Sequence, residues 1–400
     1  MKISKNSVIK TLFICSVILV HFDPTRQKLT IVLLFMPLFI LFYTRMAFKS
    51  YLPFILLGLS IIYPFVNYLT FTGFAYSFFE FSKTYVLYVT SVFIHVSVIY
   101  FSLKREQFDF SKYIIPSLML LLFITSLQFF GYLLFKTTIF YNVFGRFQYN
   151  SIAIVEEFVA GALPRTQAFY LEPSYLAFVT ISLVSVNLLY RWKEKFTLLI
   201  GGAIVIMSGS RGGYFGFFLL ILWYLLYNFK NVKVHFKMLY FLLFVSLIPA
   251  FILLSPILSL FSSDSLSTEN TSQYVRFYSG FQLSGYVLNN FYLGIPLGTI
   301  ELSFSNFLKE ENTSYSFFFF NIFYHGWMSI FVLIFIGWAI YLNSSSARNK
   351  ALLIIYVLLY FNMTGSIIAP DTYFWFFCFY YVYRVCSAND KLHIGRPIIQ

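Results

Sequence analysis

Residues 196–229 read FTLLIGGAIVIMSGSRGGYFGFFLLILWYLLYNF. Two continuous apolar runs, 196–208 and 213–229, stand on either side of a turn built from serine, glycine and arginine. A helix that crosses a bilayer needs roughly 20 mostly apolar residues. Helices are the default there because the backbone must satisfy its own hydrogen bonds in lipid. The stretch therefore predicts two consecutive membrane helices joined by a tight turn.

The composition of the whole chain agrees with this interpretation. Of 400 residues, 59% are apolar and 23% aromatic, while only 11% are charged. A soluble protein carries about 25% charged residues, and a disordered chain has low hydrophobicity. The three cysteines lie in or beside apolar segments, which does not suit a disulfide framework. The composition excludes these classes and favours a multi-spanning membrane protein.

Similar apolar segments recur along the chain and predict an all-α, polytopic transmembrane bundle of about 12 spans, forming one integral membrane domain over 1–400. They lie near 8–22, 29–44, 51–70, 85–103, 113–135, 173–190, 196–208, 213–229, 238–260, 318–341, 350–363 and 371–386.

Two linkers are long, at 136–172 and 261–317, and with the N-terminus inside both fall on the outer, periplasmic side. Sorting the charge by side supports this orientation. Of 28 Lys and Arg residues, 19 fall on the inner side with only four acidic residues beside them. Because Lys and Arg in short loops set orientation, both termini are predicted to be cytoplasmic. The net charge of +13 thus points to anionic lipid and not to nucleic acid.

The first outer linker ends in Arg165-Thr-Gln-Ala-Phe-Tyr-Leu-Glu172-Pro173-Ser174. Pro173 suits the first position of a helix, where its missing N–H would be unpaired anyway. Glu172 then lies at the helix N-terminus, where the dipole favours a carboxylate. A capped helix with a surface arginine explains the same residues equally well.

The turn Ser208-Gly-Ser210-Arg211-Gly212-Gly213 precedes another predicted helix. Helix N-termini bind anions, and a guanidinium is a forked donor suited to phosphate. An ionisable residue at this depth indicates function by default. The alternative is a tight turn in which Arg211 extends to the membrane surface.

Further polar residues lie in the outer loops. Arg276 falls in a segment that reads as an amphipathic helix lying on the membrane, followed by a Gly/Pro turn. Contact of Arg276 with a lipid phosphate and a solvated arginine on a helix anchored by aromatic residues explain this position equally well. Glu310-Glu311-Asn312 precedes a span, and Asp371 follows a short outer turn. His325 lies within a span and suits a packed, hydrogen-bonded role better than catalysis. The chain has no soluble-enzyme motif, and its scattered His and Cys do not support a metal site.

The order and shared outer location of these motifs resemble the bacterial O-antigen polymerase (Wzy) and O-antigen ligase superfamily. The similarity is closer to exopolysaccharide polymerases of the colanic acid type and covers about 110–385. It is carried by RTQAFYLEP at 165–173, SQYVR at 272–276 and TGSIIAP at 364–370.

The resemblance implies substrates that are oligosaccharide repeat units on undecaprenyl diphosphate at the outer face of a bacterial inner membrane. A hydroxyl of one unit attacks the anomeric carbon of another, and undecaprenyl diphosphate leaves, with no metal or cofactor implied. Such a leaving group needs positive charge and helix N-termini, a role that fits Arg165, Arg211 and Arg276. The hydroxyl needs a proton acceptor, for which Glu172 is the first choice and Glu311 the second. Ser210, Gly212 and Asp371 would support these loops.

Three other interpretations remain open. In related ligases a His precedes the Asn at the place where this chain has Glu311-Asn312, which argues against a ligase. Flippases often carry charges in central spans, whereas most spans here have none. A non-catalytic scaffold would not need the outer arginines. A polymerase would work beside a flippase and a chain-length regulator.

Overall fold

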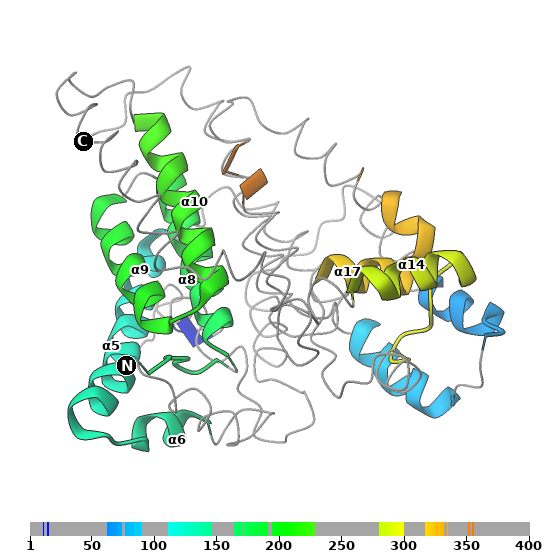
Figure 1. Ribbon diagram of the computed structural model, residues 1–400, viewed down its shortest axis with the longest axis horizontal. Helices are drawn as coiled ribbons and strands as arrows, with labels where there is room; N and C mark the ends of the chain where they lie inside the picture. Colours follow the sequence, from blue (N-terminus) through cyan, green and yellow to red (C-terminus); the bar gives the residue numbers. More distant parts are fainter. Residues whose placement is uncertain are drawn as a thin grey trace, which may run out of the picture.

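The computed structural model describes residues 62–73, 77–89, 111–145, 164–170, 172–190, 194–228, 280–299 and 317–331, and a few single positions outside these ranges. Within them the chain is helical and contains no strand, which confirms the all-α class for this part (Figure 1). The count of 12 spans and the side of the membrane on which each loop lies stay predictions.

Four helices follow the predicted apolar segments closely. They are α5 (Ser111–Phe135), α8 (Pro173–Tyr190), α9 (Glu194–Ser208) and α10 (Arg211–Asn228). Within the described ranges one helical stretch, Tyr113–Phe135, is long and apolar enough to cross a membrane, with 23 residues and a mean hydropathy of 2.1. Pro173–Leu188 and Gly212–Leu226 are apolar but shorter.

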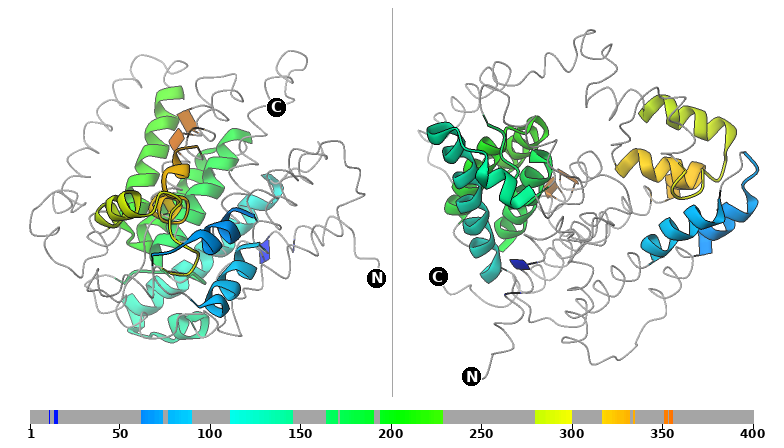
Figure 2. Two further views of the ribbon diagram at one scale, coloured as in Figure 1. Left: turned by 90° about the vertical axis from the view of Figure 1, so that its right-hand side faces the viewer. Right: turned by 90° about the horizontal axis from the view of Figure 1, so that it is seen from below.

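These helices pack together as a four-helix group of α5, α8, α9 and α10 (Figures 1 and 2). The short helix α6 (Ile139–Gly145) follows α5 in the first long linker. Helix α8 is central, because every residue from 176 to 188 is buried. In contrast, α5 exposes large apolar side chains such as Phe123, Leu134 and Phe135. A helix that is apolar all round is a buried one or one that faces lipid, and α8 and α5 illustrate the two cases.

Small residues bring the helices of this group close together. A Cβ placed on Gly213 would lie 2.4 Å from the Cβ of Ala177, so α10 and α8 nearly touch at their backbones. A Cβ placed on Gly201 of α9 would lie 2.5 Å from Val184 Cγ2, so the α9 backbone packs directly against this side chain of α8. Close approach at small residues is typical of helices packed in membranes, where burial of apolar surface does not drive association.

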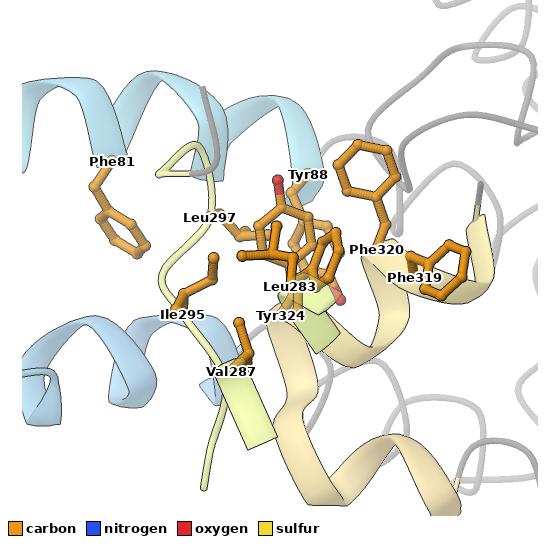
Figure 3. Packing of buried hydrophobic residues seen from close by; sticks show 10 residues of the cluster. Phe81, Tyr88, Leu283, Val287, Ile295, Leu297, Phe319, Phe320 and Tyr324 are labelled. Carbon is orange, nitrogen blue, oxygen red and sulfur yellow. The ribbon is translucent and has the colours of Figure 1, made fainter. Parts of the chain in front are cut away.

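A second set of segments, here called the aromatic group, packs around a cluster of large side chains (Figures 2 and 3). It comprises helical residues 62–70 and 78–89, α14 (Gly280–Asn290), the turn 291–299, α17 (Phe317–His325) and the 3₁₀ turn η3 (Gly326–Met328). Figure 3 shows side chains from all of these except 62–70 and η3 converging on one core. The buried members are Phe81, Tyr88, Leu283, Val287, Ile295, Leu297, Phe319, Phe320, Phe323 and Tyr324.

The sequence predicted one continuous span at 318–341, but the α-helix is interrupted after His325 by the 3₁₀ turn Gly326–Met328 and resumes at residues 329–331. Gly326 has φ of +53°, and a Cβ there would lie 2.3 Å from the Tyr292 carbonyl oxygen. The close approach of the 291–299 turn thus requires glycine and breaks the helix. The helix 78–89 is a second difference, since it begins well before the predicted segment at 85–103.

The break frees main-chain carbonyls near the end of α17, and other segments satisfy them. The Ile295 N–H donates to the Phe323 carbonyl at 2.7 Å. Asn67 Nδ2 donates to the carbonyls of Leu293 at 3.1 Å and Tyr324 at 3.4 Å, and it is 3% exposed. Non-helical backbone is tolerated in apolar surroundings only where such partners exist.

The close packing at Gly213 in the four-helix group can be tested by comparison with Gly285, which has open space beside it. Gly213→Ala should lower the free energy of unfolding by about 1 kcal/mol, because overpacking costs about 1–3 kcal/mol and outweighs the gain in helix propensity. Gly285, inside α14, has no atom within 4 Å of the position that a Cβ would take, so Gly285→Ala should stabilise by about 0.5–1 kcal/mol. Thermal unfolding of the purified protein in detergent measures both. Equal stabilisation by the two variants would contradict the close contact with Ala177.

Candidate functional site

The predicted site residues that the structure describes lie at one end of the four-helix group. The contact between Gly213 and Ala177 joins the first turn of α10 to the second turn of α8, so both helices begin at this end. Helix α9 follows α8 in the sequence and leads into α10 through a short turn, so α9 ends at this end of the group. Two helix N-termini, where the first N–H groups have no partner within their own helix, thus lie side by side, close to the segment 164–170.

A two-residue turn joins α9 to α10. Gly209 ends α9 with φ of +62°, the left-handed conformation common at helix C-termini. Ser210 caps α10, since its Oγ accepts the Gly213 N–H at 3.2 Å. The glycine and the serine cap thus order the turn, and Arg211 follows it as the first residue of α10, with the exposed Gly212 after it.

The segment 164–170 is held against this turn by main-chain hydrogen bonds. Thr166 N–H donates at 3.2 Å to the carbonyl of Met207, which lies in the last turn of α9. Gln128 of α5 makes three more bonds. Its Oε1 accepts the N–H groups of Gln167 at 3.3 Å and Ala168 at 2.8 Å, and its Nε2 donates to the Ala168 carbonyl at 3.1 Å. Gln128 is not among the residues predicted from the sequence, although a lone amide in an apolar span is a usable signal.

Arg165 extends from this segment onto the α9–α10 turn. A Cβ placed on Gly209 would lie 2.9 Å from Arg165 Cγ, so the side chain crosses the glycine backbone. Arg165 is exposed and interacts electrostatically with Tyr214, whose hydroxyl donates to the Ile206 carbonyl at 3.0 Å. The structure therefore brings Arg165 to the turn that Arg211 follows, although the two residues are 46 positions apart in the sequence.

Glu172 lies at the N-terminus of α8, as predicted, and Pro173 is the first helical residue. The Glu172 carbonyl accepts the Tyr175 N–H at 3.1 Å, while Ser174 Oγ donates to Glu172 Oε2 at 2.8 Å. The carboxylate is half-buried and oriented by this serine. Burial raises the pKa of the nearby Tyr170 hydroxyl above its ordinary value.

The remaining predicted residues are distributed differently. Arg276, Glu311 and Asp371 lie outside the described residues. His325 ends α17 with its Nδ1 3.0 Å from the Asn321 carbonyl and its ring stacked on Tyr63, which confirms the packed, hydrogen-bonded interpretation. Within the described ranges no three His, Cys, Asp or Glu side chains gather as a metal site would require.

Comparison with known proteins decides the family. A family model described as WcaD colanic acid polymerase matches residues 8–385. The chain belongs to this family. No curated protein and no solved structure matches it.

Membership in the WcaD family confirms the resemblance to colanic-acid-type polymerases, and the match begins about a hundred residues earlier than the motifs suggested. The chain is thus of the exopolysaccharide repeat-unit polymerase class, a membrane enzyme of the glycosyltransferase type that acts on lipid-linked oligosaccharides. This class favours a polymerase over the ligase and flippase alternatives.

The contact between Gly209 and Arg165 can be tested by a double-mutant cycle. Gly209→Ala should lower the free energy of unfolding by about 1–3 kcal/mol, because alanine disfavours positive φ and its Cβ meets Arg165. In the Arg165→Ala background, the loss of unfolding free energy caused by Gly209→Ala should fall by about half. Only the strain of alanine at positive φ then remains. Thermal unfolding of the four proteins gives the coupling. Strict additivity would mean that Arg165 does not lie on the turn.

Proposed function

We propose that this protein joins undecaprenyl-diphosphate-linked oligosaccharide repeat units at the periplasmic face of the inner membrane and releases undecaprenyl diphosphate. The observation that carries the proposal is the placement of Arg165 on the turn that begins α10. This placement brings the Arg165 side chain to the turn that Arg211 and the N-terminus of α10 follow. Positive charge and N–H donors together suit the recognition of a diphosphate.

In the proposed reaction the hydroxyl oxygen of one unit forms a bond to the anomeric carbon of another. The bond from that carbon to the diphosphate oxygen breaks, and its electron pair leaves with undecaprenyl diphosphate. The negative charge that develops on this oxygen is stabilised by Arg165, Arg211 and the first N–H groups of α10. Arg276 is proposed for the same role. Ser210 and Gly212 keep the α10 turn in shape, and Asp371 is proposed to support it.

Glu172 is proposed to accept the proton of the attacking hydroxyl. It belongs to the start of α8, which lies against the start of α10 through the contact of Ala177 with Gly213. Ser174 holds Oε2 of the carboxylate and so limits its rotation. Glu311 is the alternative acceptor. A flippase and a chain-length regulator are the partners that such a polymerase would need.

Removal of the Arg211 charge tests the diphosphate site. Arg211→Ala should reduce polymer at least about 100-fold, the usual effect of losing one preorganised donor to a developing negative charge. Arg211→Lys should restore only part, because lysine lacks the forked geometry. The assay is polymer length and amount in a deletion strain complemented with each variant, at equal protein level in the membrane. Lys195→Ala is the matched control, since this exposed lysine lies at the opposite end of α9. Long polymer from Arg211→Ala would rule out the site.

Glu172→Gln tests the proton acceptor while keeping the shape of the helix start. General-base catalysis contributes about 10²–10⁴-fold, so the variant should lose at least about 100-fold in polymer. Ser174→Ala removes only the hydrogen bond to Oε2 and should lose less than about tenfold. The same complementation assay compares the two. Equal, mild losses would reduce Glu172 to a helix cap.

A further inference from the structure

Two neighbouring polar side chains beside Arg165 are buried without hydrogen-bond partners. Thr166 and Gln167 are both fully enclosed, at 0% exposure. Thr166 Oγ1 and both amide atoms of Gln167, Nε2 and Oε1, find no partner in the part of the chain that the structure describes. Buried polar groups are paired in the great majority of cases, and an unpaired one calls for an explanation.

Loose placement of the segment does not explain these unpaired atoms, because its main chain is firmly held. Gln128 bonds the main chain of Gln167 and Ala168 on one side, and Met207 accepts the Thr166 N–H on the other. Ala168 has φ of +49°, a conformation unfavourable for alanine, and its side chain is buried. Strained backbone of this kind persists only where its surroundings impose it, and it is concentrated at functional sites. The fold thus holds two polar side chains where they lack partners.

We propose that Thr166 and Gln167 bind sugar hydroxyl groups of the lipid-linked repeat unit; this rests on the function proposed above. A diphosphate offers only acceptor oxygens and would leave Gln167 Oε1 unpaired. A sugar hydroxyl both donates and accepts, so a hydroxyl-rich sugar can pair the amide oxygen, the amide nitrogen and the Thr166 hydroxyl together. Of the two parts of the carrier headgroup, diphosphate and sugar, the sugar is the one that matches all three atoms.

The position in the chain indicates which sugar is bound. Thr166 and Gln167 directly follow Arg165, which we assign to the diphosphate, and consecutive Cα atoms are about 3.8 Å apart. The bound sugar is therefore one close to the diphosphate. Since the polar atoms are enclosed, the sugar reaches them only when the side chains covering them move. A sugar without the matching hydroxyl groups would leave the polar atoms of Thr166 and Gln167 unpaired. These two residues would therefore select the repeat unit by its sugar.

The variant Gln167→Met separates sugar binding from a structural role. The matched control is Gln128→Met, because Gln128 of α5 holds the main chain of the same segment. Methionine keeps the length of the side chain and removes two polar atoms that lack partners. The unfolding temperature of the ligand-free Gln167→Met protein should therefore be unchanged or higher. In Gln128→Met it should fall, because three hydrogen bonds are lost.

Two probes are then added to the purified proteins in detergent: undecaprenyl diphosphate, and the same carrier bearing the repeat unit, isolated from cells that lack this chain. Undecaprenyl diphosphate should raise the unfolding temperature of wild type and Gln167→Met equally. The additional rise from the glycosylated carrier should appear in wild type and be lost in Gln167→Met. In a polymerisation assay with the same carrier, KM should rise at least about tenfold, as for loss of a buried polar contact to the substrate.

An equal additional rise in both proteins would overturn the sugar contact while leaving the polymerase proposal intact. A fall in the unfolding temperature of ligand-free Gln167→Met as large as that of Gln128→Met would also overturn it, because Gln167 would then be a structural residue. If wild type responded to neither probe and made no polymer from the glycosylated carrier, the proposed function itself would fail.

Discussion

The structure depends on one constraint: main-chain N–H and C=O groups that leave a helix in apolar surroundings must find new partners. Two buried amide side chains meet it. Gln128 pairs three main-chain groups of the segment 164–170, and Asn67 pairs two carbonyls around the break after α17. Each amide carries both a donor and an acceptor, so one side chain can replace part of a missing helical ladder. Irregular chain can therefore lie against the helices.

This constraint also shapes the candidate site. The Thr166 N–H pairs the Met207 carbonyl, which would otherwise be an unpaired group at the end of α9. The same bond holds the segment 164–170 against the α9–α10 turn, where the Arg165 side chain lies across Gly209. Helix capping by Ser210 then orders the start of α10. A local need for hydrogen bonds thus brings together motifs from distant parts of the sequence.

Local features of both fold and site were predictable from the sequence, because their physics lies within a few residues. Pro173 marks the first residue of α8, and α8, α9 and α10 follow the apolar runs within a few positions. The break at Gly326 was not predictable. It depends on the approach of the Tyr292 carbonyl, more than thirty residues away in an otherwise apolar stretch. Pairing of Gln128 with 167–168 and of Asn67 with Leu293 is long-range in the same sense. A lone polar residue in a span signals such a bond, but its partner comes only from the fold.

The distribution of charge across the site follows from the cost of desolvation. An unpaired charge in an apolar interior costs far more than an unpaired amide or hydroxyl, which the fold can tolerate at a few kcal/mol. Arg165 is accordingly exposed, whereas its neighbours Thr166 and Gln167 are enclosed. Under the proposed function, the exposed charge of Arg165 would attract the anionic headgroup of the carrier at the membrane surface. The neutral side chains of Thr166 and Gln167 lie buried without solvent. They form hydrogen bonds only with a ligand that both donates and accepts. With an exposed arginine next to two buried neutral side chains, one short segment would divide two tasks between neighbouring residues. Arg165 would attract the carrier, and Thr166 and Gln167 would select its sugar.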